Sequence, residues 1–170
     1  SNCTLSGGGT MLLQDNESDG SGGAISTSGD SHLITGVQCR YNTADAGGAI
    51  SIGAGKVTIL ASVFDENEGG VGGGVYASGS GELVMDNVTA NRNIASVGGG
   101  VWAAYKNLNV TETMIERNTV AFGAGGVYLN SCTGSIGNTT IRLHDVAGNA
   151  GGIMLMDCNM SLNACNVRLN

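Results

Sequence analysis

Two acidic residues stand side by side at Asp65 and Glu66, in the segment FDEN, and carboxylates of this kind can perform acid–base chemistry. Glycosidases need two closely placed carboxylates, and polysaccharide lyases need acids gathered around calcium with a basic residue beside them. The repeat described below places Arg92 beside this pair but stacks no three acids in the same columns. We therefore expect a solvated ion pair among Asp65, Glu66 and Arg92 in preference to an active site.

A second acidic segment, DNESDG, has the opening spacing of an EF-hand calcium loop. Its acids are Asp15, Glu17 and Asp19, and Gly20 follows them. The closing acid of such a loop is missing, because Ser26 occupies its position. The segment therefore predicts an acidic turn, and we expect no metal site.

The remaining polar chemistry is sparse. His32 and His144 are the only histidines, so the sequence supports neither a nucleophilic triad nor a zinc site. The net charge is −7, and the seven Lys and Arg residues are scattered, which argues against nucleic acid and anionic membranes as partners. We expect a soluble chain that is not an enzyme and that needs no cofactor.

The elements that position these residues follow from an internal repeat. A glycine pair followed by a small apolar residue returns every 25 or 26 residues. The first glycines of these pairs are Gly22, Gly47, Gly73, Gly99, Gly125 and Gly151. A fixed period of this size is the signature of a stacked repeat architecture.

A second anchor has the same period and closes each unit, as in FDEN and IERN. The closing residues are Asn16, Asn42, Asn67, Asn93, Asn118, His144 and Asn170. Asparagine tolerates a left-handed corner, and its amide can bond the amides of the coils above and below. We expect a buried ladder at this corner, with Asn16 inside it and His144 as a hydrogen-bonded substitute.

The segments between these anchors favour strands. Stretches such as KVTILASVF and NLNVTETMI are rich in β-branched residues, and 30 glycines in 170 residues weaken any helical alternative. Coils of about 26 residues in parallel register predict an all-β fold, a right-handed parallel β-helix of six to seven coils. We expect one solenoid domain over residues 1–170, cut from a longer chain, with adjoining coils or other copies of itself as partners.

The repeats carry a family resemblance. FDEN, together with GGAI at Gly22 to Ile25 and at Gly47 to Ile50, resembles the FxxN and GGA[ILV] repeats of the chlamydial polymorphic outer-membrane protein family. The double-glycine motif covers nearly the whole chain. The resemblance implies a parallel β-helix at a cell surface, with a role in adhesion or envelope structure.

Two columns follow the glycine pairs, and strand alternation sends them to opposite faces. We expect the small aliphatic column to point inward: Ala24, Ala49, Val75, Val101, Val127 and Ile153. We expect the other to point outward: Ile25, Ile50, Tyr76, Trp102, Tyr128 and Met154. Tyr76, Trp102 and Tyr128 would then form an exposed stripe at about 4.8 Å spacing, suited to sugar stacking or to contact with another chain.

N-glycosylation motifs are more frequent than the composition predicts. Six N-x-[ST] sequons occur where about three are expected by chance. They begin at Asn2, Asn16, Asn87, Asn109, Asn138 and Asn159. Asn109 alternates with inward residues and should face solvent, and Asn87 shares a corner column with Asn138. In a eukaryotic source we expect a glycosylated extracellular rod.

The five cysteines leave alternatives open. Cys132 and Cys158 are one period apart in the same column, where either a disulfide or two buried free thiols fits. Cys39 and Cys165 stand in apolar columns and are expected in the core. Cys3 is left near an open end.

The function predicted from these features is an extracellular structural or adhesive module that presents the aromatic stripe. Its partners would be other copies, glycans or cell-surface molecules. The alternative is a carbohydrate-binding or polysaccharide-degrading β-helix.

Overall fold

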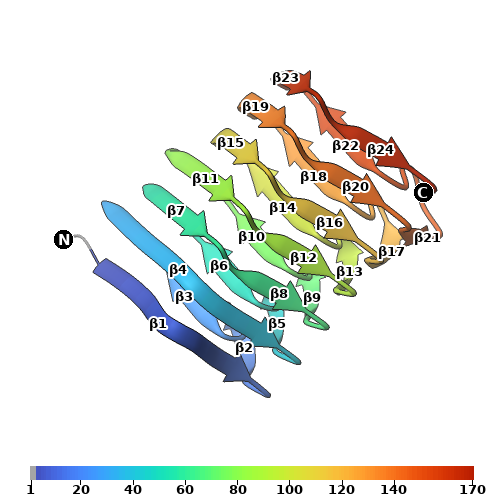
Figure 1. Ribbon diagram of the computed structural model, residues 1–170. Helices are drawn as coiled ribbons and strands as arrows, with labels where there is room; N and C mark the ends of the chain where they lie inside the picture. The colour runs from blue at the N-terminus through green and yellow to red at the C-terminus, as the bar shows by residue number, and fades with distance from the viewer. Residues whose placement is uncertain (1–2) are drawn as a thin grey trace.

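The chain folds as a parallel β-solenoid of strands and corners, without helices, in the computed structural model, which describes residues 3–170. About 26 residues make one turn of the solenoid, and about six turns stack along one axis. The two ends of the chain lie at opposite ends of the stack (Figure 1). The predicted β-helix and its period are therefore confirmed. The sequon at Asn2 lies outside the described residues.

Each complete coil presents four faces, which we number in chain order. The first face consists of β7 (Lys56–Leu60), β11 (Glu82–Asp86), β15 (Asn107–Thr111), β19 (Thr133–Gly137) and β23 (Asn159–Asn163). The second face consists of β8 (Val63–Asp65), β12 (Thr89–Asn91), β16 (Met114–Glu116), β20 (Thr140–Arg142) and β24 (Asn166–Arg168). Two long strands, β1 (Cys3–Gln14) and β4 (Ser31–Arg40), contribute to both of these faces.

The other two faces are separate six-stranded sheets. The third consists of β2 (Glu17–Ser21), β5 (Thr43–Ala46), β9 (Glu68–Val71), β13 (Ile94–Val97), β17 (Thr119–Phe122) and β21 (Asp145–Val146). The fourth consists of β3 (Ile25–Thr27), β6 (Ile50–Ile52), β10 (Val75–Ala77), β14 (Val101–Ala104), β18 (Val127–Asn130) and β22 (Ile153–Met156). Equivalent strands of neighbouring coils pair in parallel, as Figure 1 shows.

The core is a set of stacked apolar columns rather than one globular centre. Alternate residues of each strand point inward, so equivalent side chains of successive coils lie on top of one another. One column of the first face is buried from Ile34 and Ile59 to Val110 and Ile136. Its last member, Leu162, is exposed because no coil of the described chain covers it.

The asparagine corner, between the second and third faces, holds the predicted ladder. The Nδ2 amide of Asn67 donates to Oδ1 of Asn93 at 3.0 Å and to the backbone carbonyl of Cys39 at 3.0 Å. Asn42, Asn93 and Asn118 are also fully buried. The residue before each ladder position has a left-handed backbone, with φ between 52° and 60°.

The two ends of the ladder differ from the prediction. Asn16 donates to Oδ1 of Asn42 at 2.7 Å, but its side chain is exposed, as is that of Asn170. The expectation that Asn16 is inside was therefore wrong, because only one neighbouring coil covers a terminal rung. His144 joins the ladder through Nδ1, which accepts the backbone N–H of Asn118 at 3.1 Å.

A second ladder lies at the corner between the first and second faces, which we call the hydroxyl corner. The hydroxyl of Ser62 donates to the carbonyl of Leu60 at 2.7 Å and accepts the N–H of Val37 from the preceding coil at 3.3 Å. Thr113 repeats this arrangement with Thr111 and Val88. The residues before these positions have φ between 46° and 53°: Ala61, Asn87, Glu112, Asn138 and Ala164. Backbone groups at this bend are thus satisfied by side chains.

The corner between the fourth and first faces, the thiol corner, uses sulfur in the same way. The thiol of Cys132 donates to the carbonyl of Asn130 at 3.3 Å, and that of Cys158 donates to Met156 at 3.1 Å. The N–H of Cys132 donates to Sγ of Cys158 at 3.3 Å. Both cysteines are free, as are the other three. The disulfide alternative was therefore wrong, because each sulfur takes the place of a corner hydroxyl.

Candidate functional site

The strongest candidate for a binding surface is the aromatic stripe on the fourth face. Tyr76 stacks on Trp102 with ring centroids 4.7 Å apart and an interplanar angle of 7°. Trp102 stacks on Tyr128 at 6.2 Å and 6°. All three side chains are partly exposed, whereas the adjacent column is buried: Val75, Val101 and Val127. The predicted outward direction of the three rings is confirmed.

The register of the first two coils differs from the prediction. Ile50 pairs with Val75 of the inward column, and Ser51 pairs with Tyr76. Ile25 pairs with Ile50 and thus also belongs to the inward column. The outward column therefore begins with serines, and the expectation that Ile25 and Ile50 lead the stripe was wrong. The three aromatic residues occupy consecutive coils, and Met154 takes the equivalent position in the coil after them.

The stacking of the three rings determines which parts of them are open to a partner. Because β10 and β18 flank β14, Trp102 has one tyrosine ring on each side. Sugar stacking needs a free aromatic face, and the faces of Trp102 are turned toward its two neighbours. The stripe therefore presents ring edges outward, which argues against the predicted sugar platform and leaves contact with another chain.

The glycines before the stripe make room for the rings. Gly98 has φ of 68°, and a Cβ at this position would lie 2.8 Å from Cβ of Trp102 and 3.2 Å from its Cδ1. Any side chain here would be strained by the backbone conformation and would collide with the tryptophan. Gly98 therefore precedes Trp102 because any other residue at this corner would collide with the tryptophan side chain.

A second apolar column lies across the glycine corner from the stripe, at the ends of β9, β13 and β17. Val71, Val97 and Phe122 pair in register, and Phe122 is 67% exposed. A Cβ on Gly123 would lie 2.8 Å from Cγ1 of Val97 and 3.2 Å from Cδ2 of Tyr128, so the two columns meet there. We call these six residues the aromatic ridge: Val71, Val97, Phe122, Tyr76, Trp102 and Tyr128.

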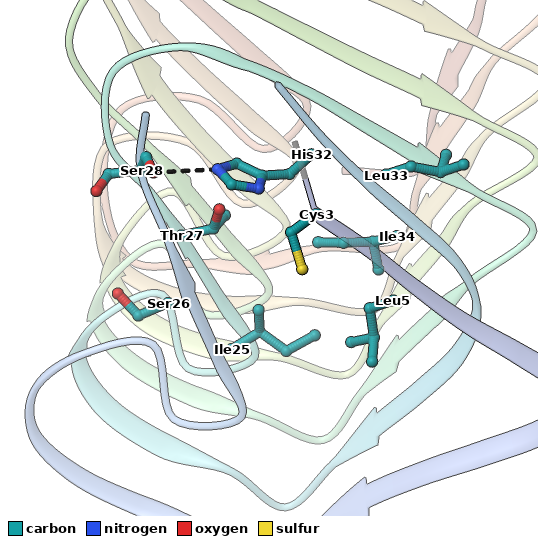
Figure 2. A pocket seen from close by; sticks show the side chains of 9 residues that line it. All are labelled: Cys3, Leu5, Ile25, Ser26, Thr27, Ser28, His32, Leu33 and Ile34. Atoms are coloured by element: carbon teal, nitrogen blue, oxygen red, sulfur yellow. Dashed lines mark hydrogen bonds between the residues drawn. The ribbon is translucent and has the colours of Figure 1, made fainter. Parts of the chain in front are cut away.

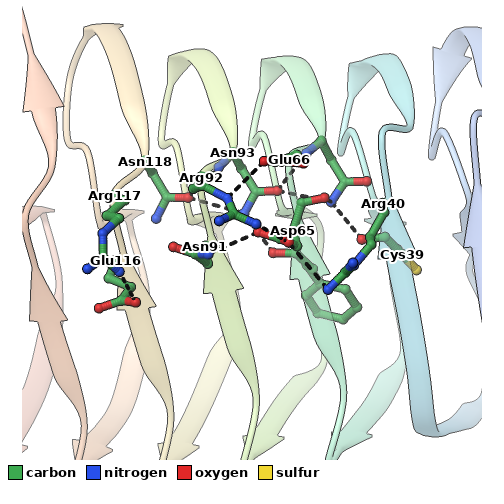
Figure 3. Close-up of polar contacts among 12 residues, drawn as sticks. Cys39, Arg40, Asp65, Glu66, Asn91, Arg92, Asn93, Glu116, Arg117 and Asn118 are labelled. Carbon is green, nitrogen blue, oxygen red and sulfur yellow. Dashed lines mark hydrogen bonds and ion pairs between the residues drawn. The ribbon is translucent and has the colours of Figure 1, made fainter. Parts of the chain in front are cut away.

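The acidic pair considered for catalysis lies at the asparagine corner, in a network of arginines (Figure 3). Asp65 is only 3% exposed, and its carboxylate accepts from Nη2 of Arg92 at 2.6 Å and from Nδ2 of Asn91 at 3.0 Å. Arg40 lies 3.6 Å away, and Arg92 also contacts Glu66 at 3.0 Å. The hydrogen bond to Asp65 raises the pKa of Arg92. The expected solvated ion pair was therefore wrong for Asp65, which is buried beneath its arginines.

A similar pairing continues two coils further on. Glu116 is buried and contacts Arg117 and, at 2.7 Å, Nε of Arg142. Five of the seven Lys and Arg residues lie in these two columns: Arg40, Arg92, Arg117, Arg142 and Arg168. The basic residues are thus not scattered, as the sequence suggested, but concentrated along one edge. Each of the two buried carboxylates is held by arginine.

Another acidic surface lies on the third face, where Glu17 and Asp19 share a hollow of about 360 Å³ with Asp45 and Glu68. It contains part of the EF-hand-like segment, whose Asp15 lies at the asparagine corner with φ of 57°. Within residues 3–170, no three His, Cys, Asp or Glu side chains gather as a metal ion would require. The segment forms a corner and a strand rather than a calcium loop.

An apolar hollow of about 460 Å³ opens at the end of the stack that carries β1 (Figure 2). Leu5, Ile25 and Ile34 line it, and they belong to the inward columns. His32 lies at its rim and contacts the backbone carbonyl of Ser28 at 3.0 Å. The hollow is thus the exposed end of the core, and His32 is bound to the backbone.

No motif or repeat in the sequence singles out Lys106. It occupies the thiol corner one coil before Cys132, and its side chain is only 2% exposed. Its ammonium donates to the carbonyls of Gly53 at 2.6 Å and Gly55 at 3.3 Å, and to that of Ser80. Burial lowers the pKa of this lysine. The ammonium therefore links the backbones of the two coils before its own.

Four of the sequon asparagines lie on the first face or at its end. Asn109 in β15 and Asn159 in β23 are exposed, as are Asn87 and Asn138 at the hydroxyl corner. The predicted orientation of Asn109 and the shared corner of Asn87 and Asn138 are confirmed. Whether they carry glycans stays a prediction.

Comparison with known protein families finds no match, and neither a search of curated proteins nor a search of solved structures finds one. The parallel β-solenoid is thus established by the structure, whereas the resemblance to the chlamydial family has no further support. Within the part of the chain that the structure describes, no helix is long and apolar enough to cross a membrane.

Proposed function

We propose that this chain is an extracellular structural module that adheres to a partner protein through the aromatic ridge. The exposure of Phe122 beside the stripe carries the proposal. Contiguous exposed apolar surface of this kind is typical of protein–protein contact sites. The parallel pairing of every coil with the next supplies a stiff support for such a surface.

A protein partner fits the ridge better than a sugar does. The stripe offers ring edges, and the neighbouring valines and Phe122 add aliphatic and aromatic surface without charge. Such a surface favours apolar side chains of another chain, which gain by burial in proportion to the area removed from water. A polysaccharide would need open ring faces or a polar groove beside them.

The surface location is supported by the repeat pattern. FDEN and GGAI resemble repeats of a family of bacterial surface proteins, and stiff solenoids suit display away from a cell. The alternative of a polysaccharide-degrading enzyme gains no support from Asp65 or Glu116, because arginines hold both carboxylates.

An adhesion assay tests the proposal. Beads coated with the chain are incubated with cultured animal cells, with microbial cells and with beads that carry a second copy. We expect adherence to one of these, reduced at least tenfold by Phe122→Ser but unchanged by Tyr105→Asn. Tyr105 is a matched control, because it is 64% exposed but lies at the thiol corner, away from the ridge.

Two results would count against this function. The first is an absence of adherence to every surface, or equal adherence of the two variants. The second is turnover of any acidic or neutral polysaccharide, with or without calcium, which would favour the enzymatic alternative.

A further inference from the structure

We infer that the first face carries N-linked oligosaccharides on four consecutive coils, at Asn87, Asn109, Asn138 and Asn159, and that the aromatic ridge is left bare. The inference rests on the proposed extracellular function, because the sugar is added in a secretory pathway. It adds a modified face and an unmodified face to the same rod.

All four sites have the local geometry that the modification needs. In each sequon the asparagine is exposed, the middle residue points inward, and the hydroxyl residue points outward again. Val88 and Thr139 are buried middle residues, and Thr89 and Thr140 are the partly exposed hydroxyl residues that follow them. Strand alternation places both reactive parts of the motif on one accessible surface at Asn109 and Asn159. At Asn87 and Asn138 the asparagine has a left-handed backbone at the hydroxyl corner, and the hydroxyl residue begins β12 or β20 of the second face.

The four side-chain amides are also unoccupied. None of them makes a hydrogen bond to another residue of the described chain, and each can therefore serve as an acceptor of sugar. The sequon at Asn16 differs, because its Nδ2 donates to Asn42 at 2.7 Å within the asparagine ladder. Asn16 is exposed like the others, so it serves as a control. If exposure alone allowed glycosylation, Asn16 would be modified despite its hydrogen-bonded amide.

The spacing leaves room for one sugar chain on each coil. Asn87 and Asn138 lie two coils apart at the hydroxyl corner, which corresponds to about 10 Å. Asn109 in β15 and Asn159 in β23 also lie two coils apart. Their coils alternate with those of Asn87 and Asn138. Because Asn109 pairs with Val84, three residues before Asn87, the nearest sites are again separated by about 10 Å. The sites therefore form a zigzag along the rod.

The same arrangement keeps sugars away from the ridge. In the cyclic order of the four faces, the hydroxyl corner with Asn87 and Asn138 lies opposite the glycine corner that carries Trp102 and Phe122. Asn109 lies within the first face, and Asn159 begins that face beside the thiol corner. The third and fourth faces have no sequon apart from the one whose asparagine is Asn16. A glycan layer on the first face would thus confine adhesion to the opposite side.

The chemistry requires a lipid pyrophosphate-linked oligosaccharide as co-substrate. The Nδ2 nitrogen of the asparagine forms a bond to C1 of the first sugar and loses one proton. The bond between that C1 and the pyrophosphate oxygen breaks, and the lipid pyrophosphate leaves with the electron pair. No oxidation or reduction takes place.

The test is secretion of the full chain from a eukaryotic cell, followed by peptide mapping with ¹⁸O labelling during enzymatic sugar removal. We expect label at three or more of the four sites and none at Asn16. Replacing the four by glutamine, one after another, should lower the mass in steps. Label at Asn16 comparable with the others, or at fewer than three of the four sites, would overturn the inference.

The adhesion result separates this inference from the proposed function. If the sites are unmodified but Phe122→Ser still abolishes adherence, only the glycan inference falls. If the sites are modified but Phe122→Ser adheres like the unaltered chain, only the role of the ridge falls.

Discussion

The Nδ2 amide of Asn93 donates to Oδ1 of Asn118 at 3.1 Å and, with its other hydrogen, to the carbonyl of Phe64 at 3.0 Å. One side chain thus links three coils. Asn93→Ala would leave buried polar groups on both neighbouring coils without partners, so we expect a loss of about 1–3 kcal/mol in unfolding free energy. Asn109→Ala, at an exposed amide without such bonds, is the control and should change it by less than about 0.5 kcal/mol. Equal unfolding midpoints for the two variants in urea would contradict a stabilising role for the ladder.

His144 should make the stability depend on pH. Burial lowers its pKa from 6.5 to about 4 in the folded chain. Between these values the unfolded chain binds a proton that the folded chain does not, so the unfolding free energy falls as the pH falls from 6.5 to 4. The loss should reach at most about 3 kcal/mol.

The comparison with His144→Asn isolates this effect from the titration of carboxylates. Asparagine would continue the ladder between Asn118 and Asn170 without a titratable group. We expect the variant to be more stable than the unaltered chain, with the difference growing below pH 6.5. A difference that is constant from pH 8 to pH 4 would show that His144 does not titrate as described.

The sequence predicted the asparagine ladder because six of its seven positions are asparagine at one period. It predicted the inward direction of Val75, Val101 and Val127 because valine recurs there at the same period. It failed where the residue types change along a column. The hydroxyl corner passes from Val37 through Ser62 and Val88 to Thr113, so its common role is not visible in residue identity. The register error at Ile50 arose because the glycine with positive φ, rather than the glycine pair, is the structural anchor of the corner.

Gly98→Ala tests that anchor. The left-handed φ of 68° and a Cβ position 2.8 Å from Cβ of Trp102 make any side chain unfavourable. We therefore expect the free energy of unfolding to fall by about 1–3 kcal/mol. Gly20→Ala is the control, because a Cβ there meets nothing within 4 Å. Thermal unfolding should show a lower midpoint for Gly98→Ala than for Gly20→Ala. The emission of the single tryptophan should change only in Gly98→Ala.

The five cysteines should react as free thiols. We expect all five to be titrated by a thiol reagent in denaturant without any reductant. In the native chain exposed Cys3 should react fastest and buried Cys39 slowest, because burial raises the pKa of the Cys39 thiol to about 12. A count of three thiols in denaturant would instead indicate a disulfide, with Cys132 and Cys158 as the first pair to examine.

Lys106 should make the stability rise with pH in the alkaline range. Burial lowers the pKa of its ammonium in the folded chain, whereas the unfolded chain keeps the proton up to about pH 10.5. Between the lowered pKa and 10.5 the unfolded chain binds more protons than the folded chain, so the unfolding free energy increases with pH there. Lys106→Met keeps the length of the side chain and removes the titration, so its stability should lack this rise.

The matched control for Lys106 is Lys56→Met, since Lys56 is exposed and pairs with Glu82 at 2.6 Å. Urea unfolding from pH 7 to pH 10.5 should show a difference between the unaltered chain and Lys106→Met that changes with pH. The corresponding difference for Lys56→Met should stay smaller, because surface ion pairs contribute little. If both variants differ from the unaltered chain by amounts that change with pH in the same way, the pKa of the Lys106 ammonium is not lowered. Its hydrogen bonds to three carbonyls would then stabilise the charged form enough to offset the effect of burial.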